Sequence, residues 1–343
     1  MSATTVLSIG NFDGVHLGHR ALMERAAALA GPDGRVVVLS FDPHPISRLR
    51  PDHTPGLLTT FEQRRDLLLR AGADEVVKLS PDPDLLDLEP AEFIARIVKQ
   101  YRPKALVEGW NFRFGHKRRG QVDMLRDLGA QHGFAVEVVE PVELSLNDQL
   151  LTTVSSTLVR WLIRHGRVAD ACRMLGRPYR IAGQVVSGAK RGRTIGYPTA
   201  NLQTPNLLPA PGVYAGLAFT PADDNEQRTR PSWPAAINIG SRPTFDAGEV
   251  SCEAHLIGFN GPLDSYGWTL EIDLLAYLRD EVRFDSPETL VHQIQADTCR
   301  AAEAVRRDTA PRPACLPDGP DTTGRRPSGP PNDRNTSRGC TVG

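Results

Sequence analysis

The spacing of the apolar residues changes once along this chain of 343 residues, and that change limits the folds open to it. Up to about residue 142, short apolar runs alternate with segments whose apolar residues recur at helical spacing. Beyond Tyr179 apolar and polar positions alternate, which is the period of a half-buried strand. The change predicts an α/β, Rossmann-like domain with a parallel sheet, followed by a small antiparallel β-barrel and a C-terminal helix.

Turn residues and helix caps divide the chain further. Strands are predicted at residues 6–9, 36–41, 75–79, 105–107 and 135–139, and helices at 20–29, 61–71 and 91–101. A helix start at Ser155 and a second short helix ending at Gly176 are expected to bridge the domains. The barrel strands are predicted at 180–186, 213–219, 235–239, 253–259 and 269–277, with a last helix at 287–307.

The last part of the chain has a different composition. From Thr309 onward it is rich in Pro, Gly, Ser and charged residues and has almost no large apolar side chains, so we expect a disordered tail. The predicted limits are therefore 1–176 for the first domain, 177–308 for the barrel and 309–343 for the tail.

Composition excludes several classes of function. A net charge of −1 gives no general attraction to nucleic acid or membrane, so any anion binding must come from local groups. The five cysteines form no CxxC pair and have no histidines at metal spacing, which argues against a disulfide framework or a zinc site. The sequence has no run of eighteen apolar residues and no signal-peptide pattern at its start, so we expect a cytoplasmic protein.

The segment GNFDGVHLGHR, from Gly10 to Arg20, is the first chemical signal. It follows a predicted strand and opens a predicted helix, where a parallel sheet binds phosphates. Two imidazoles, His16 and His19, flank Gly18, whose missing side chain lets the backbone approach a triphosphate. The pattern HxGH is typical of nucleotidyl transferases; the alternative is a pair of surface histidines. The candidate ATP-binding residues of this segment are Gly10, Asn11, Phe12, Asp13 and Gly18, beside His16 and His19.

Three further segments fit the same interpretation, although each has an ordinary structural alternative. FDPHP holds His44 in a rigid turn after the second strand, and GWNFRFG places Asn111 between aromatic residues, suited to an ATP site. The run SSTLVR offers hydroxyls and helix-start amides to an anion, with a guanidinium one turn along. Its candidate residues are Ser155, Ser156, Thr157 and Arg160. Taken alone, these segments read as a loop histidine, a packed turn and a capped helix.

The order of these segments closely resembles the adenylyltransferase domain of the prokaryotic bifunctional riboflavin kinase/FAD synthetase family. The motifs that carry the resemblance are GNFDGVHLGH, FDPHP, LLTTFEQRR, GWNFRFG and SSTLVR followed by LGRPY. The resemblance implies that His16 and His19 contact the ATP phosphates, and that Asn111 and Arg160 hold ATP and its transition state. It also implies that His44, Thr59 and Thr60 lie near FMN.

The second chemical signal lies in the predicted barrel, around the segment GRTIGYPTANL. Glycines 188 and 192, close to the basic residues Lys190 and Arg193, suggest an arch whose amides surround phosphates. In PTAN, Thr199 and Asn201 are two residues apart and share one side of an extended segment. Such oxygen ligands suit Mg²⁺, which needs few protein ligands beside phosphate. The alternative is a β-turn with solvated polar residues. The candidate ATP-binding residues here are Gly188, Lys190, Gly192 and Arg193.

Glu253 is the candidate general base for a kinase of this design. It opens an apolar strand, VSCEAHL, where a carboxylate that does not face solvent suggests a function. The alternative is an outward-facing residue on the solvated side of the barrel.

GRTIGYPTANL, LPAPGVYAG, INIGSRPTF, CEAHLIGF and LRDEVRFDSPETLVHQIQAD resemble the riboflavin kinase domain in order and spacing. That resemblance implies that Thr199 and Asn201 bind Mg-ATP and that Glu253 deprotonates the riboflavin 5′-hydroxyl. It also assigns Arg279 and Phe284 to a flap over the flavin.

The sequence departs from the family pattern at a few places. Asn111 stands where many relatives have Asp, and Ser187 stands where many have His. A lengthened turn at 264–265 and a polar loop at 222–232 are further differences. None of these departures removes a residue assigned to chemistry, although the lost carboxylate at Asn111 weakens the case for metal or ribose binding there.

Three functions are open at this point. The first is a bifunctional enzyme that phosphorylates riboflavin to FMN and adenylylates FMN to FAD. The second has one working domain, or acts on a flavin analogue. The third is a flavin-binding regulator without catalysis, which would have no need of a base such as Glu253. The expected partners are riboflavin, FMN, ATP and Mg²⁺, with no nucleic acid and no membrane, and weak self-association stays open.

Overall fold

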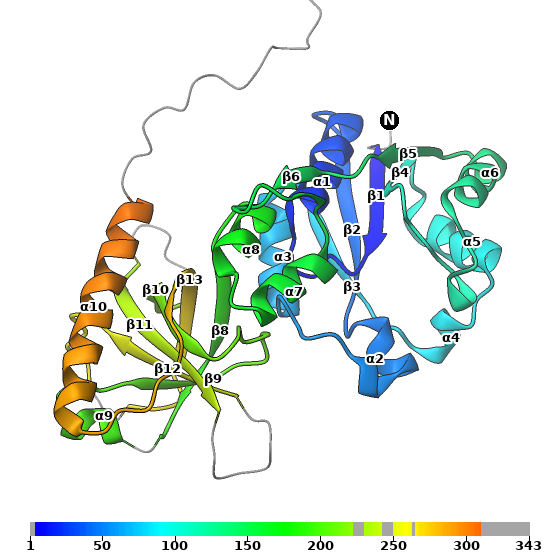
Figure 1. Ribbon diagram of the computed structural model, residues 1–343. Coiled ribbons are helices and arrows are strands. Elements are labelled where there is room, and N and C mark those ends of the chain that lie inside the picture. The colour runs from blue at the N-terminus through cyan, green and yellow to red at the C-terminus, as the bar shows by residue number, and fades with distance from the viewer. Residues whose placement is uncertain (1–3, 189, 222–229, 242–249, 263–264, 310–343) are drawn as a thin grey trace, which may run out of the picture. The chain divides into compact units, whose positions relative to one another are not determined.

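A computed structural model of the protein describes residues 4–188, 190–221, 230–241, 250–262 and 265–309 (Figure 1). The predicted tail beyond Thr309, most of the polar loop at 222–232 and position 264 of the lengthened turn lie outside these residues. Within them, no helix is long and apolar enough to cross a membrane.

A five-stranded parallel sheet forms the first domain, in the order β3-β2-β1-β4-β5 (Figure 1). The order reverses between β1 and β4, which is where open parallel sheets bind ligands at their carboxyl ends. The buried positions of the three central strands are filled mainly by Val, Leu and Ile, as a sheet covered on both faces requires. The strands are β1 (Thr5–Gly10), β2 (Arg35–Phe41), β3 (Glu75–Leu79), β4 (Ala105–Gly109) and β5 (Ala135–Val139).

Helices connect these strands, and their ends follow ordinary capping rules. The start of α3 is a capping box, in which Thr60 and Gln63 exchange side-chain hydrogen bonds with each other's backbone. The helices that precede the bridging pair are α1 (Leu17–Ala30), α2 (Pro45–Leu49), η1 (Pro51–His53), α3 (Phe61–Arg70), α4 (Pro83–Leu86), α5 (Pro90–Tyr101), η2 (His116–Arg118) and α6 (Val122–His132). A small hairpin of β6 (Glu143–Ser145) and β7 (Leu151–Thr153) follows β5.

The second domain is a closed barrel in the order β10-β11-β12-β9-β8-β13, with every pair antiparallel. Its strands are β8 (Tyr179–Val186), β9 (Ala200–Gln203), β10 (Gly212–Phe219), β11 (Ser232–Ser241), β12 (Val250–Leu256) and β13 (Thr269–Arg279). A short helix, α9 (Arg191–Thr194), lies between β8 and β9. The predicted fold class is confirmed, whereas the strand predicted at 253–259 lies further toward the N-terminus, because a turn follows Leu256.

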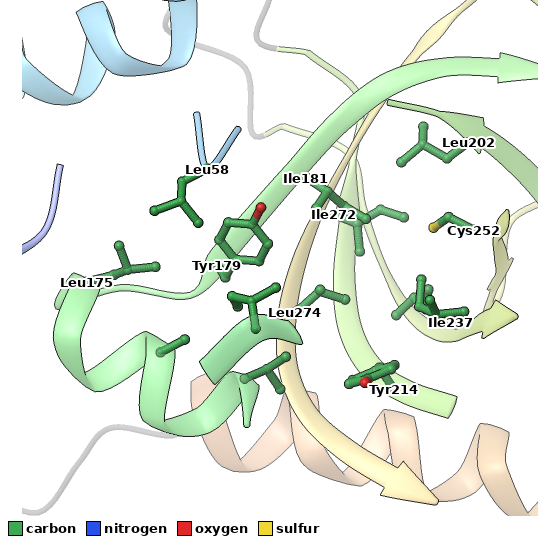
Figure 2. Close-up of a cluster of buried hydrophobic side chains, with 14 of the residues drawn as sticks. Leu58, Leu175, Tyr179, Ile181, Leu202, Tyr214, Ile237, Cys252, Ile272 and Leu274 are labelled. Atoms are coloured by element: carbon green, nitrogen blue, oxygen red, sulfur yellow. The ribbon is translucent and has the colours of Figure 1, made fainter. Parts of the chain in front are cut away.

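The bridging helices α7 (Ser156–Arg164) and α8 (Val168–Leu175) pack into the same hydrophobic cluster as the barrel interior (Figure 2). In this cluster Leu58 and Leu175 lie near Tyr179, whose hydroxyl donates to the Leu207 carbonyl at 2.8 Å. The predicted boundary near residue 176 falls between the end of α8 and the start of β8, and it stays a prediction because the apolar core continues across it.

The last helix, α10 (Pro287–Thr309), is tied to the end of β13 by an ion pair. The Arg279 guanidinium donates to both carboxylate oxygens of Asp297, which is almost fully buried. Ala301 and Val305 extend the buried face of the helix by one and two turns. The predicted helix is confirmed with bounds that differ by two residues at its end.

Candidate active sites

The loop after β1 carries the first predicted site. Its backbone takes positive φ at Phe12 (49°), Gly14 (86°) and Val15 (41°), which is uncommon for residues with a side chain. The loop delivers His16 to the start of α1, where its Nδ1 atom accepts a hydrogen bond from the His19 amide at 3.3 Å. The neutral His16 ring therefore carries its proton on Nε2, which can donate to a phosphate oxygen.

The two histidine rings of this loop stack with their centroids 3.7 Å apart. Between them in sequence, a Cβ atom at Gly18 would lie 3.2 Å from the His16 ring, so glycine leaves the ring its place. Burial lowers the pKa of His16 to about 4 and lowers the pKa of His19 well below its ordinary value. Both rings are therefore neutral near pH 7 and can act as uncharged hydrogen-bond donors.

Asp13 is a buried carboxylate that holds the loop in place. Its Oδ1 atom accepts from the Thr59 amide at 2.8 Å and from the Thr59 hydroxyl at 2.9 Å. Its Oδ2 atom accepts from the Leu58 amide and from the Arg160 guanidinium. Because its side-chain oxygens are committed to internal donors, any contact of this residue with ATP is left to its main chain.

Helix α7 is joined to the histidine loop by two of the predicted residues. The Ser156 hydroxyl donates to the Asp13 carbonyl at 2.7 Å, and Arg160 also donates from Nε to the Gly56 carbonyl at 2.7 Å. Ser155 is the N-cap of α7, and its hydroxyl accepts from the Leu158 amide at 3.2 Å. This segment is therefore a capped helix that lies against the histidine loop, and its binding of an anion stays a prediction.

His44 lies beside the same loop. Its Nδ1 atom accepts from the Ile46 amide at 3.1 Å, and its Nε2 atom lies 3.1 Å from the Asn11 side-chain amide. Burial is the main cause that lowers the pKa of His44 to about 4, and the Arg160 charge adds to it. The segments containing His16, His44, Thr59 and Arg160, far apart in sequence, thus meet at one end of the sheet.

Sequence reasoning missed Arg64, a buried cation of α3. Its Nη1 atom donates to the Ser40 hydroxyl at 3.1 Å and to the Phe41 carbonyl at 2.7 Å. Its charge is one of the causes that lower the pKa of His19. The motif LLTTFEQRR indicated a helix, but nothing local shows which of its two adjacent arginines turns inward.

Some predicted residues are not drawn into this cluster. Asn111 is exposed, and no hydrogen bond among the described residues joins it to the histidines; the neighbouring Trp110 is 54% exposed. Thr157 is also exposed. The hydroxyl of Thr60 accepts from the Gln63 amide at 3.2 Å as a helix cap. Roles for these side chains in ligand binding stay predictions.

In the barrel, the PTAN segment lies against β12. Asn201 pairs with Glu253 across the two strands, and the Thr199 hydroxyl donates to Glu253 Oε2 at 3.3 Å. Asn201 is nearly buried and Glu253 is half-buried. A hydroxyl, an amide oxygen and a carboxylate gathered on one strand pair form a donor set of the kind that fits Mg²⁺ together with phosphate.

The glycine arch lies directly against this segment. A Cβ atom at Gly188 would lie 2.2 Å from Asn201 Nδ2, and one at Gly192 would lie 2.2 Å from the Tyr197 carbonyl oxygen. A side chain at either position would therefore clash with the PTAN strand or with the turn before it. The two glycines are required here by the close approach of these neighbours, and their predicted role around phosphates stays a prediction.

A cavity of about 300 Å³ opens between the arch and the PTAN strand. Basic and aromatic side chains face each other across it, and the Lys190 ammonium lies 5.8 Å from the Tyr266 ring centroid. The cavity is large enough for part of a nucleotide and combines a few polar groups with aromatic walls. Its lining includes Lys190, Arg193, Thr199, Asn201, His255, Tyr266 and Trp268.

His255 is a second residue that sequence reasoning missed. Its Nδ1 atom lies 2.8 Å from the Pro198 carbonyl, which can only accept, so Nδ1 carries a proton. The ring also meets Tyr197 edge-on, with centroids 5.3 Å apart. The alternating pattern of VSCEAHL was the available signal, because it places His255 on the same face of the strand as Glu253.

The two residues predicted for a flavin flap are close to each other. The Arg279 guanidinium lies 5.6 Å from the Phe284 ring centroid, within cation–π range. Because Arg279 also forms the ion pair with Asp297, it fixes α10 as well as facing Phe284. A contact of either residue with flavin stays a prediction.

Comparison with known proteins gives two family matches. A model described as FAD synthetase matches residues 1–157, and a model described as riboflavin kinase matches residues 175–305.

Curated relatives cover nearly the whole chain. A bifunctional riboflavin kinase/FMN adenylyltransferase of Pseudomonas fluorescens is 39% identical over 314 residues, which is 90% of this chain and 94% of the relative. The protein of the same description from Escherichia coli K12 is 35% identical, over 87% of this chain and 92% of the relative. A crystal structure described as a macrolide-efflux protein from Streptococcus pneumoniae is 32% identical, with a TM-score of 0.76 over 88% of this chain and 95% of that one.

Proposed function

The chain belongs to the bifunctional riboflavin kinase/FMN adenylyltransferase family, and from that membership we propose which of its residues carry each of the two reactions. The reactions are phosphorylation of riboflavin by ATP to FMN, and adenylylation of FMN by ATP to FAD with release of pyrophosphate. We assign the first reaction to the barrel and the second to the parallel-sheet domain.

In the barrel, Glu253 is the general base. Its carboxylate takes the proton of the riboflavin 5′-hydroxyl while that oxygen attacks the γ-phosphorus of ATP, and ADP leaves. The observation that supports this role is the hydrogen bond from Thr199 to Oε2 at 3.3 Å, which holds one carboxylate oxygen and leaves Oε1 for the substrate. Thr199 and Asn201 are the proposed Mg²⁺ ligands, and the bound ion would neutralise charge on the ATP phosphates.

The glycine arch supplies the other groups that bind the ATP phosphates in the barrel. Backbone amides at Gly188 and Gly192 face the phosphates, and Lys190 and Arg193, which line the 300 Å³ cavity, offset their negative charge. Arg279 and Phe284 are proposed to contribute to the flap that covers the flavin. The flap assignment rests on the family resemblance and on their mutual contact.

In the first domain, a phosphate oxygen of FMN attacks the α-phosphorus of ATP and the bond to pyrophosphate breaks. No proton need be removed from FMN, so the protein's task is to position the groups and stabilise charge on the leaving pyrophosphate. His16 and His19 do this as neutral donors, because burial keeps the pKa of both rings below the ordinary value. The stacked pair at 3.7 Å is the observation that carries this assignment.

The rest of this site positions the substrates. Gly10 to Asp13 and Gly18 provide main-chain contacts to ATP, and the start of α7 from Ser155 to Thr157 adds amides and hydroxyls. Arg160 orients the histidine loop through Asp13 and presents its remaining donors to ATP. Asn111 is assigned to ATP, and His44, Thr59 and Thr60 to the FMN side, on the family resemblance alone.

One experiment tests the assignment as a whole. The purified protein is incubated with riboflavin, ATP and Mg²⁺, and FMN and FAD are separated over time. The bifunctional assignment predicts that FMN appears first and FAD follows, and that omission of Mg²⁺ stops both. A chain with one working domain would stop at FMN or would accept only supplied FMN, and a flavin-binding regulator would make neither product.

Location and assembly complete the proposal. We propose that both reactions take place in the cytoplasm, on a chain that self-associates weakly. Size-exclusion chromatography with light scattering at several protein concentrations tests the second point, since weak association makes the apparent mass rise with concentration.

A further inference from the structure

The carboxyl group of Glu108, on strand β4, is buried and has no part in the reactions assigned above. The side chain is 2% exposed, and its Oε1 atom accepts a hydrogen bond from the Ile9 amide of the neighbouring strand at 2.7 Å. A buried acid in a parallel sheet is costly, because water no longer solvates it. Burial accordingly raises the pKa of Glu108 well above its ordinary value, so the group is largely neutral.

This hydrogen bond takes the place of a main-chain hydrogen bond between β1 and β4. β1 and β2 stay paired along all of β1, from Thr5 to Gly10. On its other side β1 pairs with β4 only at Val6 and Leu7, although both strands continue. The next amide of β1 that points toward β4 is that of Ile9, and in a regular parallel ladder it would bond to a main-chain carbonyl. It bonds to the side chain of Glu108 instead.

The position of this interruption matters for the site. β1 and β4 are the pair at which the strand order reverses, and the crevice between their carboxyl ends is where such sheets take ligands. β1 ends at Gly10, one residue beyond Ile9, and the histidine loop follows it; β4 ends at Gly109, one residue beyond Glu108, and the loop that carries Asn111 follows it. The spacing of the two strand ends therefore sets the spacing of the two loops.

We infer that Glu108 is a positioning residue for adenylylation: its carboxyl group lies between the ends of β1 and β4, satisfies Ile9, and keeps the two loops apart at the width that ATP requires. The inference rests on the assignment of ATP to this crevice. Glu108 touches neither substrate, and its acidity is not used. What is needed at this position is a side chain long enough to reach Ile9 and able to accept one hydrogen bond.

Three variants separate this role from the alternatives. Glu108→Gln keeps length and acceptor, whereas Glu108→Val removes both and offers β4 a good strand former. Val38→Ala is the matched control, because Val38 is fully buried on β2, which pairs with β1 on the side away from β4 and the crevice. Glu108→Asp, one methylene shorter, replaces the valine variant if that protein does not fold.

The expected result is a loss of about 10²-fold in kcat/KM for FMN adenylylation in Glu108→Val, since a displacement of about 1 Å at a reacting centre costs that much. Glu108→Gln should stay within about threefold of the parent, with an unchanged pH profile. FMN formation from riboflavin should be unchanged in all variants. A crystal structure of Glu108→Val should show the β1–β4 ladder extended by at least one residue pair.

Several outcomes would overturn the inference. Parental adenylylation in Glu108→Val, or an unextended ladder, would show that Glu108 does not space the strands. Loss of kcat in Glu108→Gln with a shifted pH profile would mean that the acid itself reacts, and an equal kinetic loss in Val38→Ala would reduce Glu108 to a stability effect. Failure of the proposed adenylylation site would give another result. His19→Ala would then still form FAD, while the β1–β4 pairing in Glu108→Val would still extend.

Discussion

The two candidate sites are built in opposite ways. In the parallel-sheet domain the chemical groups are buried against one another, and the Asp13 carboxylate alone receives donors from three other residues. In the barrel, Glu253 is half-buried and, among the described residues, receives one side-chain hydrogen bond, from Thr199. Its strand pairs with Asn201 of β9 on one side and with Asn238 of β11 on the other. A substitution at the first site therefore disturbs structure and chemistry together, whereas the second site can be altered one group at a time.

The sharpest test of this contrast is Glu253→Ala. Loss of a general base typically costs about 10²–10⁴ in rate, so FMN formation from riboflavin should nearly stop. Conversion of supplied FMN to FAD should continue at the parental rate, and the melting temperature should change little because the residue is half-buried. Near-normal kinase activity in this variant would show that Glu253 is not the base.

His19→Ala tests the buried site. Removal of one donor to a developing charge costs about 10²–10³ in rate, so the variant should accumulate FMN and form little FAD. Unlike Glu253→Ala, it should also lower the melting temperature, because the stacked partner of His16 is lost. His132→Ala, an exposed histidine at the end of α6, is the matched control. FAD formation at the parental rate in His19→Ala would contradict the assignment.

A third variant, Arg193→Gln, tests the arch. A charge-assisted hydrogen bond contributes about 1.5–3 kcal/mol, so its loss should raise the KM for ATP in FMN formation by about tenfold or more. The KM for ATP in FAD formation should not change, because Arg193 lines the barrel cavity. Equal damage to both reactions would mean that the arch is structural or that the two domains are coupled.

Acid should affect the buried site through stability. Burial lowers the pKa of His16 from 6.5 to about 4, so between these values the unfolded chain binds a proton that the folded chain does not. The contribution of His16 is therefore fully present above about pH 6.5 and is lost as the pH falls toward 4. In His16→Asn, the free energy of unfolding should change less with pH between about 4 and 6.5 than in the parent. A slope identical to that of the parent would mean that the ring is solvated in the folded protein.

The smallest effect is expected from removal of residues 310–343. Their composition cannot form a packed core, so truncation should leave both activities and the melting temperature nearly unchanged. The full-length protein, measured in parallel, is the reference. A large loss in only one of the two reactions would show that the tail contributes to that domain, which would be a further difference between the two sites.

Local sequence patterns predicted the strands of the parallel sheet well, because continuous apolar runs between turn residues have few other solutions. They failed where a residue depends on a distant partner. Asp13 finds its donors 45 to 147 positions away, and the buried Asp297 pairs with Arg279, 18 positions earlier in the chain. Strand β9 was missed as an element because it is only four residues long and two of its residues, Asn201 and Gln203, are polar.

The same limit applies to the sites. Histidine and glycine spacing identified the groups around His16, since chemistry and backbone geometry both act locally there. Glu108 reads as the end of a strand until the register of β1 and β4 is known, and His255 reads as an alternating polar residue until Pro198 is placed beside it. Sequence patterns show which groups are present, whereas the fold decides which of them face one another.

The hydrophobic cluster shared by α7, α8 and the barrel has a consequence for attempts to isolate either activity. A fragment cut at residue 176 would expose side chains such as Leu58 and Leu175 on one piece and Tyr179 on the other, together with the Asn206 side chain that bonds to the Leu58 carbonyl. Newly exposed apolar patches favour aggregation. A stand-alone kinase or adenylyltransferase made from this chain would first need a redesigned surface along that cut, with polar residues at the positions that the other half now covers.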